Sequence, residues 1–218
     1  MFFKKKEELP AQEQMLNYMK EKYQEDFAPG LCELANWAYS YDSMTVYSEK
    51  FPEEFIQVYR YENKIFKDNY MAFLFREEIE KIVHNIVEPL FGRCVVIMHE
   101  SNYPVDVDLP KDASLDDYLK NKPIMNNFYI YIEKFDESKD YKECIEKMRI
   151  QFKDKLLPHS FDLYFIKSDK SLDEIKRETE RNILINRGED SWFVKRAHFC
   201  FLENYELRES DLRQIWKN

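Results

Sequence analysis

The sequence predicts an α+β protein in which an N-terminal helix, an antiparallel meander and a long helix precede alternating strands and helices. Apolar residues recur at helical spacing between positions 70 and 90. Short aromatic and β-branched runs, separated by turn-like residues, fill positions 31–66, and similar runs alternate with helical segments after position 92. We expect a flexible tail (1–10), a helix-meander-helix lobe (11–91) and an alternating lobe (92–218), packed as one compact unit.

The first lobe is expected to open with an amphipathic helix over residues 11–27. Met15, Met19 and Tyr23 recur there at helical spacing among charged residues, and Pro29 and Gly30 follow as a stop signal. The meander comes next, with three or four strands. They are expected at 31–39, 43–48, 55–61 and 65–66.

A long helix from Tyr70 to about Leu90 closes this lobe, capped by Asp68 or Asn69. The apolar residues of its inward stripe are Met71, Phe75, Ile79, Ile82, Val83, Ile86 and Leu90. In the second lobe, strands are expected at 94–99, 128–133, 161–167 and 192–203, and helices near 114–121, 139–157 and 171–184. This order indicates a sheet covered by helices on one or both faces.

Composition bounds the classes of function. The chain has 218 residues, 44% of them hydrophobic and 16% aromatic, which is enough for a core without disulfides or metals. Its net charge of −9 would repel a polyanion, so nucleic acid is a disfavoured partner, whereas a basic protein fits. The sequence does not predict an oligomeric state.

The four cysteines, Cys32, Cys94, Cys144 and Cys200, are far apart and form no CxxC pair, which favours reduced thiols in a reducing compartment. No apolar run is long enough for a signal peptide or a membrane span, so the chain as written is expected to be cytoplasmic. An exported or lipid-anchored location is expected instead if the chain is a truncated form.

Two stretches carry a resemblance to other proteins. These are MLNYMKEKY at Met15–Tyr23 and DNYMAF at Asp68–Phe73. Together with the order of elements over residues 11–90, they resemble small uncharacterised α+β proteins of Gram-positive bacteria, some of them lipoproteins. The resemblance implies no activity, and the chain lacks the anchoring cysteine near its start that a lipoprotein member would show.

No local motif for catalysis is present. The chain contains no GxGxxG, GxxxxGK[ST], GxSxG or HExxH, so P-loop and dinucleotide-binding enzymes, common hydrolases and zincins fit poorly. We therefore assign no catalytic residue, no metal ligand and no cofactor. The residues of any binding site are not predicted.

Three weaker constellations were weighed. His84 lies four residues from both Glu80 and Glu88, a spacing that suits a divalent cation or a general base, although a solvated helix face is favoured. His198 and Cys200 alternate on an expected strand, as two zinc ligands or a thiol nucleophile would, but packing against the sheet is favoured.

The third constellation is Asp106 and Asp108, alternate carboxylates in the irregular loop 101–113. They suit calcium or magnesium, but a plain solvated loop is favoured.

Two functions remain open. The favoured one is a non-enzymatic interaction or accessory protein with an acidic surface, which uses aromatic anchors to hold a partner. The alternative is a motif-poor enzyme or small-ligand-binding protein with a pocket between helix and sheet.

Overall fold

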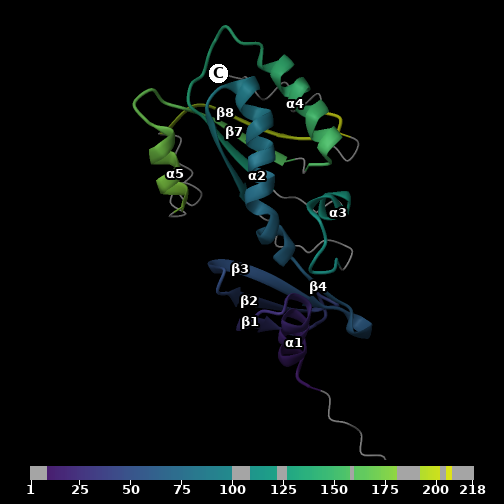
Figure 1. The fold of residues 1–218 in the computed structure, drawn as a ribbon. Coiled ribbons are helices and arrows are strands. Elements are labelled where there is room, and N and C mark those ends of the chain that lie inside the picture. Colours follow the sequence, from purple (N-terminus) through teal and green to yellow (C-terminus); the bar gives the residue numbers. More distant parts are fainter. Residues whose placement is uncertain are drawn as a thin grey trace, which may run out of the picture. The chain divides into compact units, whose positions relative to one another are not determined.

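The computed structural model describes residues 9–99, 109–121, 127–157, 160–180, 192–201 and 205–207 (Figure 1). Its chain divides into two compact units, and the division falls inside the long helix α2 (Tyr70–Phe91). Unit 1 contains residues up to 74 together with 101–124, and unit 2 contains 75–100 together with 125–218. The predicted fold class is confirmed: helix, meander, long helix, then alternating strands and helices.

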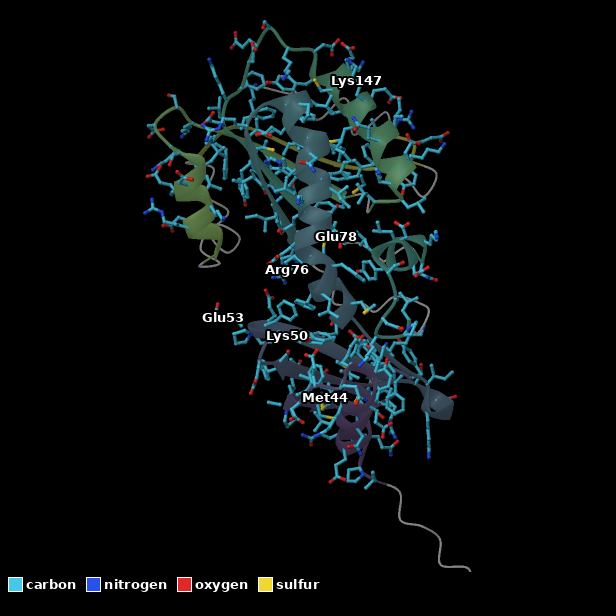
Figure 2. All side chains as sticks on the ribbon, viewed as in Figure 1. Met44, Lys50, Glu53, Arg76, Glu78 and Lys147 are labelled. Atoms are coloured by element: carbon cyan, nitrogen blue, oxygen red, sulfur yellow. The ribbon has the colours of Figure 1, made fainter. Side chains whose placement is uncertain are left out.

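Unit 1 is built on a four-stranded antiparallel sheet, sheet A, in the order β1-β2-β3-β4. Its strands are β1 (Phe27–Glu33), β2 (Asp42–Ser48), β3 (Phe51–Arg60) and β4 (Phe66–Asp68), with a 3₁₀ turn η1 (Glu62–Lys64) before β4. Helix α1 (Ala11–Tyr23) covers one face, to which it contributes Met15, Met19 and Tyr23. Met44, between the sheet and α1, is fully buried, whereas Glu53 projects outward (Figure 2).

Two boundaries in unit 1 differ from the prediction. Helix α1 ends at Tyr23 and not at Phe27. Gln24 takes a left-handed conformation there, and its N–H donates the last helical hydrogen bond to the Lys20 carbonyl. The first strand begins at Phe27 and includes Pro29, which sequence reading takes for a turn. Pro29 is tolerated because β1 is an edge strand that needs no donor on its outer side.

Asp68 holds the interior of unit 1 together. Its buried carboxylate accepts hydrogen bonds from four donors. They are the hydroxyls of Tyr18 and Tyr23 (2.7 and 2.6 Å), the Nζ of Lys22 (2.9 Å) and the backbone N–H of Tyr70 (2.9 Å). The last bond makes Asp68 a cap for α2, as predicted, and the others tie α1 to the sheet.

Unit 2 is built on a mixed four-stranded sheet, sheet B, in the order β5-β6-β7-β8. Its strands are β5 (Cys94–His99), β6 (Asn127–Ile132), β7 (Ser160–Ile166) and β8 (Phe193–Cys200). The pair β6 and β7 is parallel and the other two pairs are antiparallel. The parallel pair is connected through α4 (Tyr141–Lys155), as a parallel pair requires a long crossover.

Helices cover both faces of sheet B. On one face, Phe152 of α4 packs edge-on against Phe128 and Phe161, and the Cys144 thiol of α4 donates to the Leu90 carbonyl of α2. On the other face, α5 (Leu172–Glu180) packs Leu172 and Ile175 into a cluster with sheet residues. The sheet members of that cluster include Tyr131, Tyr164 and Ile166. The short helix α3 (Leu115–Lys120) belongs to unit 1 and begins with a capping box at Ser114.

Candidate functional site

An ordered turn between β1 and β2 presents the most exposed large side chain described, Trp37, which is 99% exposed. The buried Asp42 carboxylate accepts the Ala35 N–H at 2.7 Å and also holds the Arg60 side chain at 2.6 Å. Within the turn, Asn36 donates its N–H to the Tyr39 carbonyl at 2.9 Å. Trp37 is therefore displayed to solvent by a segment whose backbone is already fixed.

Exposed apolar side chains continue on either side of Trp37. We define the Trp37 surface as Leu31, Leu34, Trp37 and Tyr39, all of which are exposed. Tyr39 connects this surface to the face of sheet A opposite α1. It stacks obliquely on Tyr41, which in turn contacts Tyr59 and Tyr61 at ring distances of 5.3 and 5.5 Å. Sequence reading missed the turn because it assigned 31–39 to a strand.

A carboxylate beside the Trp37 surface lacks a cation. Glu33 pairs across the sheet with Ser43 and has no ion-pair partner within the described ranges. Two cations of the same unit form ion pairs, Arg60 with Asp42 and Lys50 with Glu25, and Lys67 lies over the Tyr61 ring. Glu33 therefore contributes an exposed negative charge beside the surface.

A second polar cluster lies on sheet B, where alternation aims one residue in two to the same face. The Cys200 Sγ lies 3.8 Å from the His198 Nε2, and the His198 Nδ1 lies 3.2 Å from an Asp162 carboxylate oxygen. Cys200 also donates to the Ser160 hydroxyl at 3.4 Å. The structure thus brings the predicted His198 and Cys200 pair together with a carboxylate from β7.

Asp162 is 5% exposed and is held from two further directions. Asn127 donates its side-chain N–H at 3.1 Å, and Arg196 donates at 3.2 Å while its guanidinium lies over the Tyr164 ring. The Asn127 Oδ1 is buried and accepts no hydrogen bond from the described residues. Sequence reading missed Asp162 because it meets His198 only through the register of β7 with β8. Asp162 interrupts the apolar run of β7, which is the one sequence signal for it.

The His84 constellation does not form a compact site. His84 lies 3.9 Å from Glu88, but Glu80 turns to β5 and accepts the Met98 N–H at 2.7 Å. Burial raises the pKa of the Glu80 carboxyl, and the Met98 N–H partly opposes that shift. Glu80 thus satisfies a backbone donor on the edge strand of sheet B.

No group of three or more potential metal-ligating side chains occurs in the described part of the chain. Asp106 and Asp108 lie outside the described residues. A depression of about 560 Å³ lies beside the start of α4 in unit 2, with Phe135 and Tyr141 as its aromatic lining and Lys139, Lys142 and Lys195 as its cations. This depression is not the pocket between helix and sheet expected for a small-ligand-binding protein, because that pocket would lie within residues 11–91.

Comparison with known proteins yields one distant structural likeness to report. The chain is similar to a crystal structure of a DUF5037 family protein from Ruminococcus gnavus, at a TM-score of 0.49 and 12% sequence identity, over 92% of this chain and 95% of that one. No protein-family model and no curated protein matches the chain. No helix among the described residues is long and apolar enough to span a membrane.

Proposed function

We propose that this protein is a non-enzymatic interaction protein that holds a basic protein partner on the Trp37 surface. One observation carries the proposal: a tryptophan is 99% exposed in a turn whose backbone N–H groups are held by hydrogen bonds to the buried Asp42 carboxylate and to the Tyr39 carbonyl. Tryptophan and tyrosine are the side chains most enriched among binding hot spots. A preformed turn also lowers the entropy lost on binding, because its backbone is already ordered.

The Trp37 surface has the anatomy of an interface. Leu31 and Leu34 precede the tryptophan in the sequence as exposed apolar side chains, and Tyr39 contacts Tyr41, which packs on the buried Tyr59 of β3. In a complex, such side chains would exclude water around a central anchor. Aromatic side chains with few rotatable bonds give a large contact area at a low entropic cost.

Charge supports a basic partner over a second copy or a nucleic acid. Glu33 lies beside the surface without an ion-pair partner in the described part of the chain. The whole chain carries a net charge of −9, so two copies repel one another, as do the chain and a polyanion. A cationic partner would be steered towards the surface, with a rate that falls as salt rises.

The expected setting is a reducing compartment such as the cytoplasm. All four cysteines are unpaired, and burial raises the pKa of the Cys94 thiol to about 12 and that of Cys144 in the same direction. Buried thiols of this kind are inert structural groups that need no disulfide. This supports the reducing setting over the exported one.

The test is capture followed by affinity measurement. The immobilised chain is exposed to a lysate of its source organism at low salt, and the proteins released by high salt are identified and purified. We expect a stoichiometric basic protein whose affinity falls by about 2 kcal/mol, or roughly thirtyfold, in Trp37→Ala. Glu33→Lys is expected to weaken binding mainly at low salt.

Two matched variants serve as controls. Val194→Ala removes an exposed apolar side chain from β8, and Glu137→Lys makes the same charge reversal as Glu33→Lys on an exposed position of unit 2. Neither is expected to change the affinity by more than about twofold. A captured protein that binds Trp37→Ala as well as the wild type, or a column that retains nothing basic, would overturn the proposal.

A further inference from the structure

We propose that Cys200 is an acyl-accepting nucleophile, with His198 as its general base and Asp162 as the residue that orients His198. The proposal concerns unit 2 and is independent of the partner-binding role proposed for unit 1. The substrate class is an acyl group carried as an activated ester or a thioester. The sequence places His198 and Cys200 on one strand, and the register of β7 with β8 adds Asp162 to them.

The order of contacts is that of a nucleophile, a base and an orienting group. Cys200 Sγ lies 3.8 Å from His198 Nε2, and His198 Nδ1 lies 3.2 Å from Asp162. With its Nδ1–H directed at the carboxylate, the imidazole leaves Nε2 free to take the thiol proton. All three residues lie on paired strands, which hold a constellation more rigidly than loops do.

Burial of the Asp162 carboxylate costs desolvation free energy, which suggests a functional role for it. A carboxylate that is 5% exposed must be compensated by donors, and Asn127 and Arg196 supply them in addition to His198. Beside this carboxylate, the buried Asn127 Oδ1 has no hydrogen-bond donor within the described ranges. A buried acceptor without a partner is a place where the N–H or O–H of a bound molecule would gain a full hydrogen bond.

The site is open to a substrate, and its thiol is the accessible one in unit 2. The His198 side chain is 57% exposed and Cys200 is partly exposed, whereas Cys94 and Cys144 are buried. Cys94 and Cys144 also belong to the opposite face of sheet B, where α2 and α4 pack. An electrophile in solution can therefore reach Cys200 without opening the core.

Acyl transfer fits the cluster better than disulfide exchange or metal binding. Disulfide exchange within a protein uses a second, resolving thiol, and the other thiols of unit 2 lie across the sheet. No group of three potential metal-ligating side chains in the described part of the chain is placed to hold a metal ion together. Acyl transfer, by contrast, needs one oriented imidazole. It acts first as a base towards the thiol and then as an acid towards the leaving group.

The step balances within the cluster and its substrate. His198 Nε2 takes the Cys200 proton as Sγ forms a bond to the carbonyl carbon of the acyl donor. The bond from that carbon to the leaving oxygen or sulfur then breaks, and the leaving group takes the proton from the imidazolium. Water, deprotonated by the same imidazole, attacks the thioester and releases a carboxylic acid and the free thiol.

The first test measures the rate at which iodoacetamide alkylates each cysteine of the folded protein from pH 5 to 9, by peptide mass spectrometry. We expect Cys200 to react about tenfold faster at pH 6.5 than in the unfolded chain, because His198 lies beside the thiol as a base. His198→Gln is expected to remove this advantage. A Cys200 rate that equals that of the unfolded chain at every pH would overturn the proposal without any variant.

The second test uses p-nitrophenyl acetate as the acyl donor. We expect a burst of about one p-nitrophenolate per chain, an acetyl group on the Cys200 peptide, and loss of both in Cys200→Ser and His198→Gln. The Asp162→Asn variant tests positioning: it should slow acetylation at all pH values while Cys200 stays accessible. A reactive Cys200 that takes up no acetyl group would overturn the acyl assignment.

Discussion

The two sheets have the same number of strands but differ in how many of their faces are buried. In sheet A, strand β2 alternates between buried and partly exposed residues, because α1 covers one face. In sheet B, strand β7 is buried at every position after the first, because α4 and α5 pack on opposite faces. Alternating burial along a strand therefore indicates a sheet with one face more exposed than the other. A continuous buried apolar run indicates a sheet that is covered on both faces.

The candidate sites follow from this difference. Beside sheet A, the turn that precedes β2 carries the exposed Trp37 and leads into a row of tyrosines. On sheet B, helices pack on both faces, and the polar cluster is formed by Asp162 of β7 with His198 and Cys200 of β8. The turn offers apolar area for a partner, whereas sheet B offers a small, rigid group of polar side chains.

The largest expected effect compares one phenylalanine from each sheet. Phe161 on β7 is fully buried and contacts the rings of Phe128, Phe152 and Phe199. Phe161→Ala is therefore expected to lower the free energy of unfolding by about 4 kcal/mol. Phe55→Ala on β3 removes an exposed ring and is expected to lower it by less than about 1 kcal/mol. Urea unfolding of both variants measures the difference. Equal losses would show that Phe55 is packed as closely as Phe161.

The next effect tests the interior of unit 1. Asp68→Ala removes the carboxylate that accepts from two tyrosine hydroxyls and the Lys22 ammonium, and it is expected to lower the free energy of unfolding by about 3 kcal/mol. The matched control is Asp26→Ala, which removes an exposed carboxylate paired only with Lys20. Its expected cost is below about 0.5 kcal/mol. If both variants unfold at the same urea concentration, the Asp68 network does not hold α1 to the sheet.

Much of the fold could be predicted from the sequence, because its elements have clear periodicity. The long helix was predicted to begin at Tyr70, and β5 was predicted at its observed bounds. The candidate sites were harder to predict. Trp37 lies in a turn that depends on a hydrogen bond to Asp42, and Asp162 meets His198 only when β8 pairs with β7. Contacts between residues distant in sequence leave no local pattern.

A smaller effect concerns the edge of sheet B and its response to pH. Burial raises the pKa of Glu80 in the folded chain, so the folded state binds more protons than the unfolded state just above pH 4.5. The stability that Glu80 contributes is complete below that pH and is lost as pH rises through the folded-state pKa. Glu80→Gln keeps an acceptor for the Met98 N–H and removes the buried charge.

The variant should therefore raise the urea midpoint at pH 7 and leave it nearly unchanged at pH 4. The exposed Glu78→Gln on the same helix is the control and should change neither value. If Glu80→Gln raised the urea midpoint equally at pH 4 and pH 7, the added stability would not come from removal of the Glu80 charge.

The most direct test of the partner-binding account observes Trp37 itself. Of the three tryptophans, Trp192 and Trp216 can be replaced by phenylalanine, so that Trp37 is the sole indole emitter. In the free chain its emission should be that of an indole in water, since the side chain is 99% exposed. Titration with the captured basic protein should shift the emission to the blue as the ring is buried, and the shift should be half complete at the measured Kd. An emission maximum that stays unchanged while the partner binds to saturation would contradict the account.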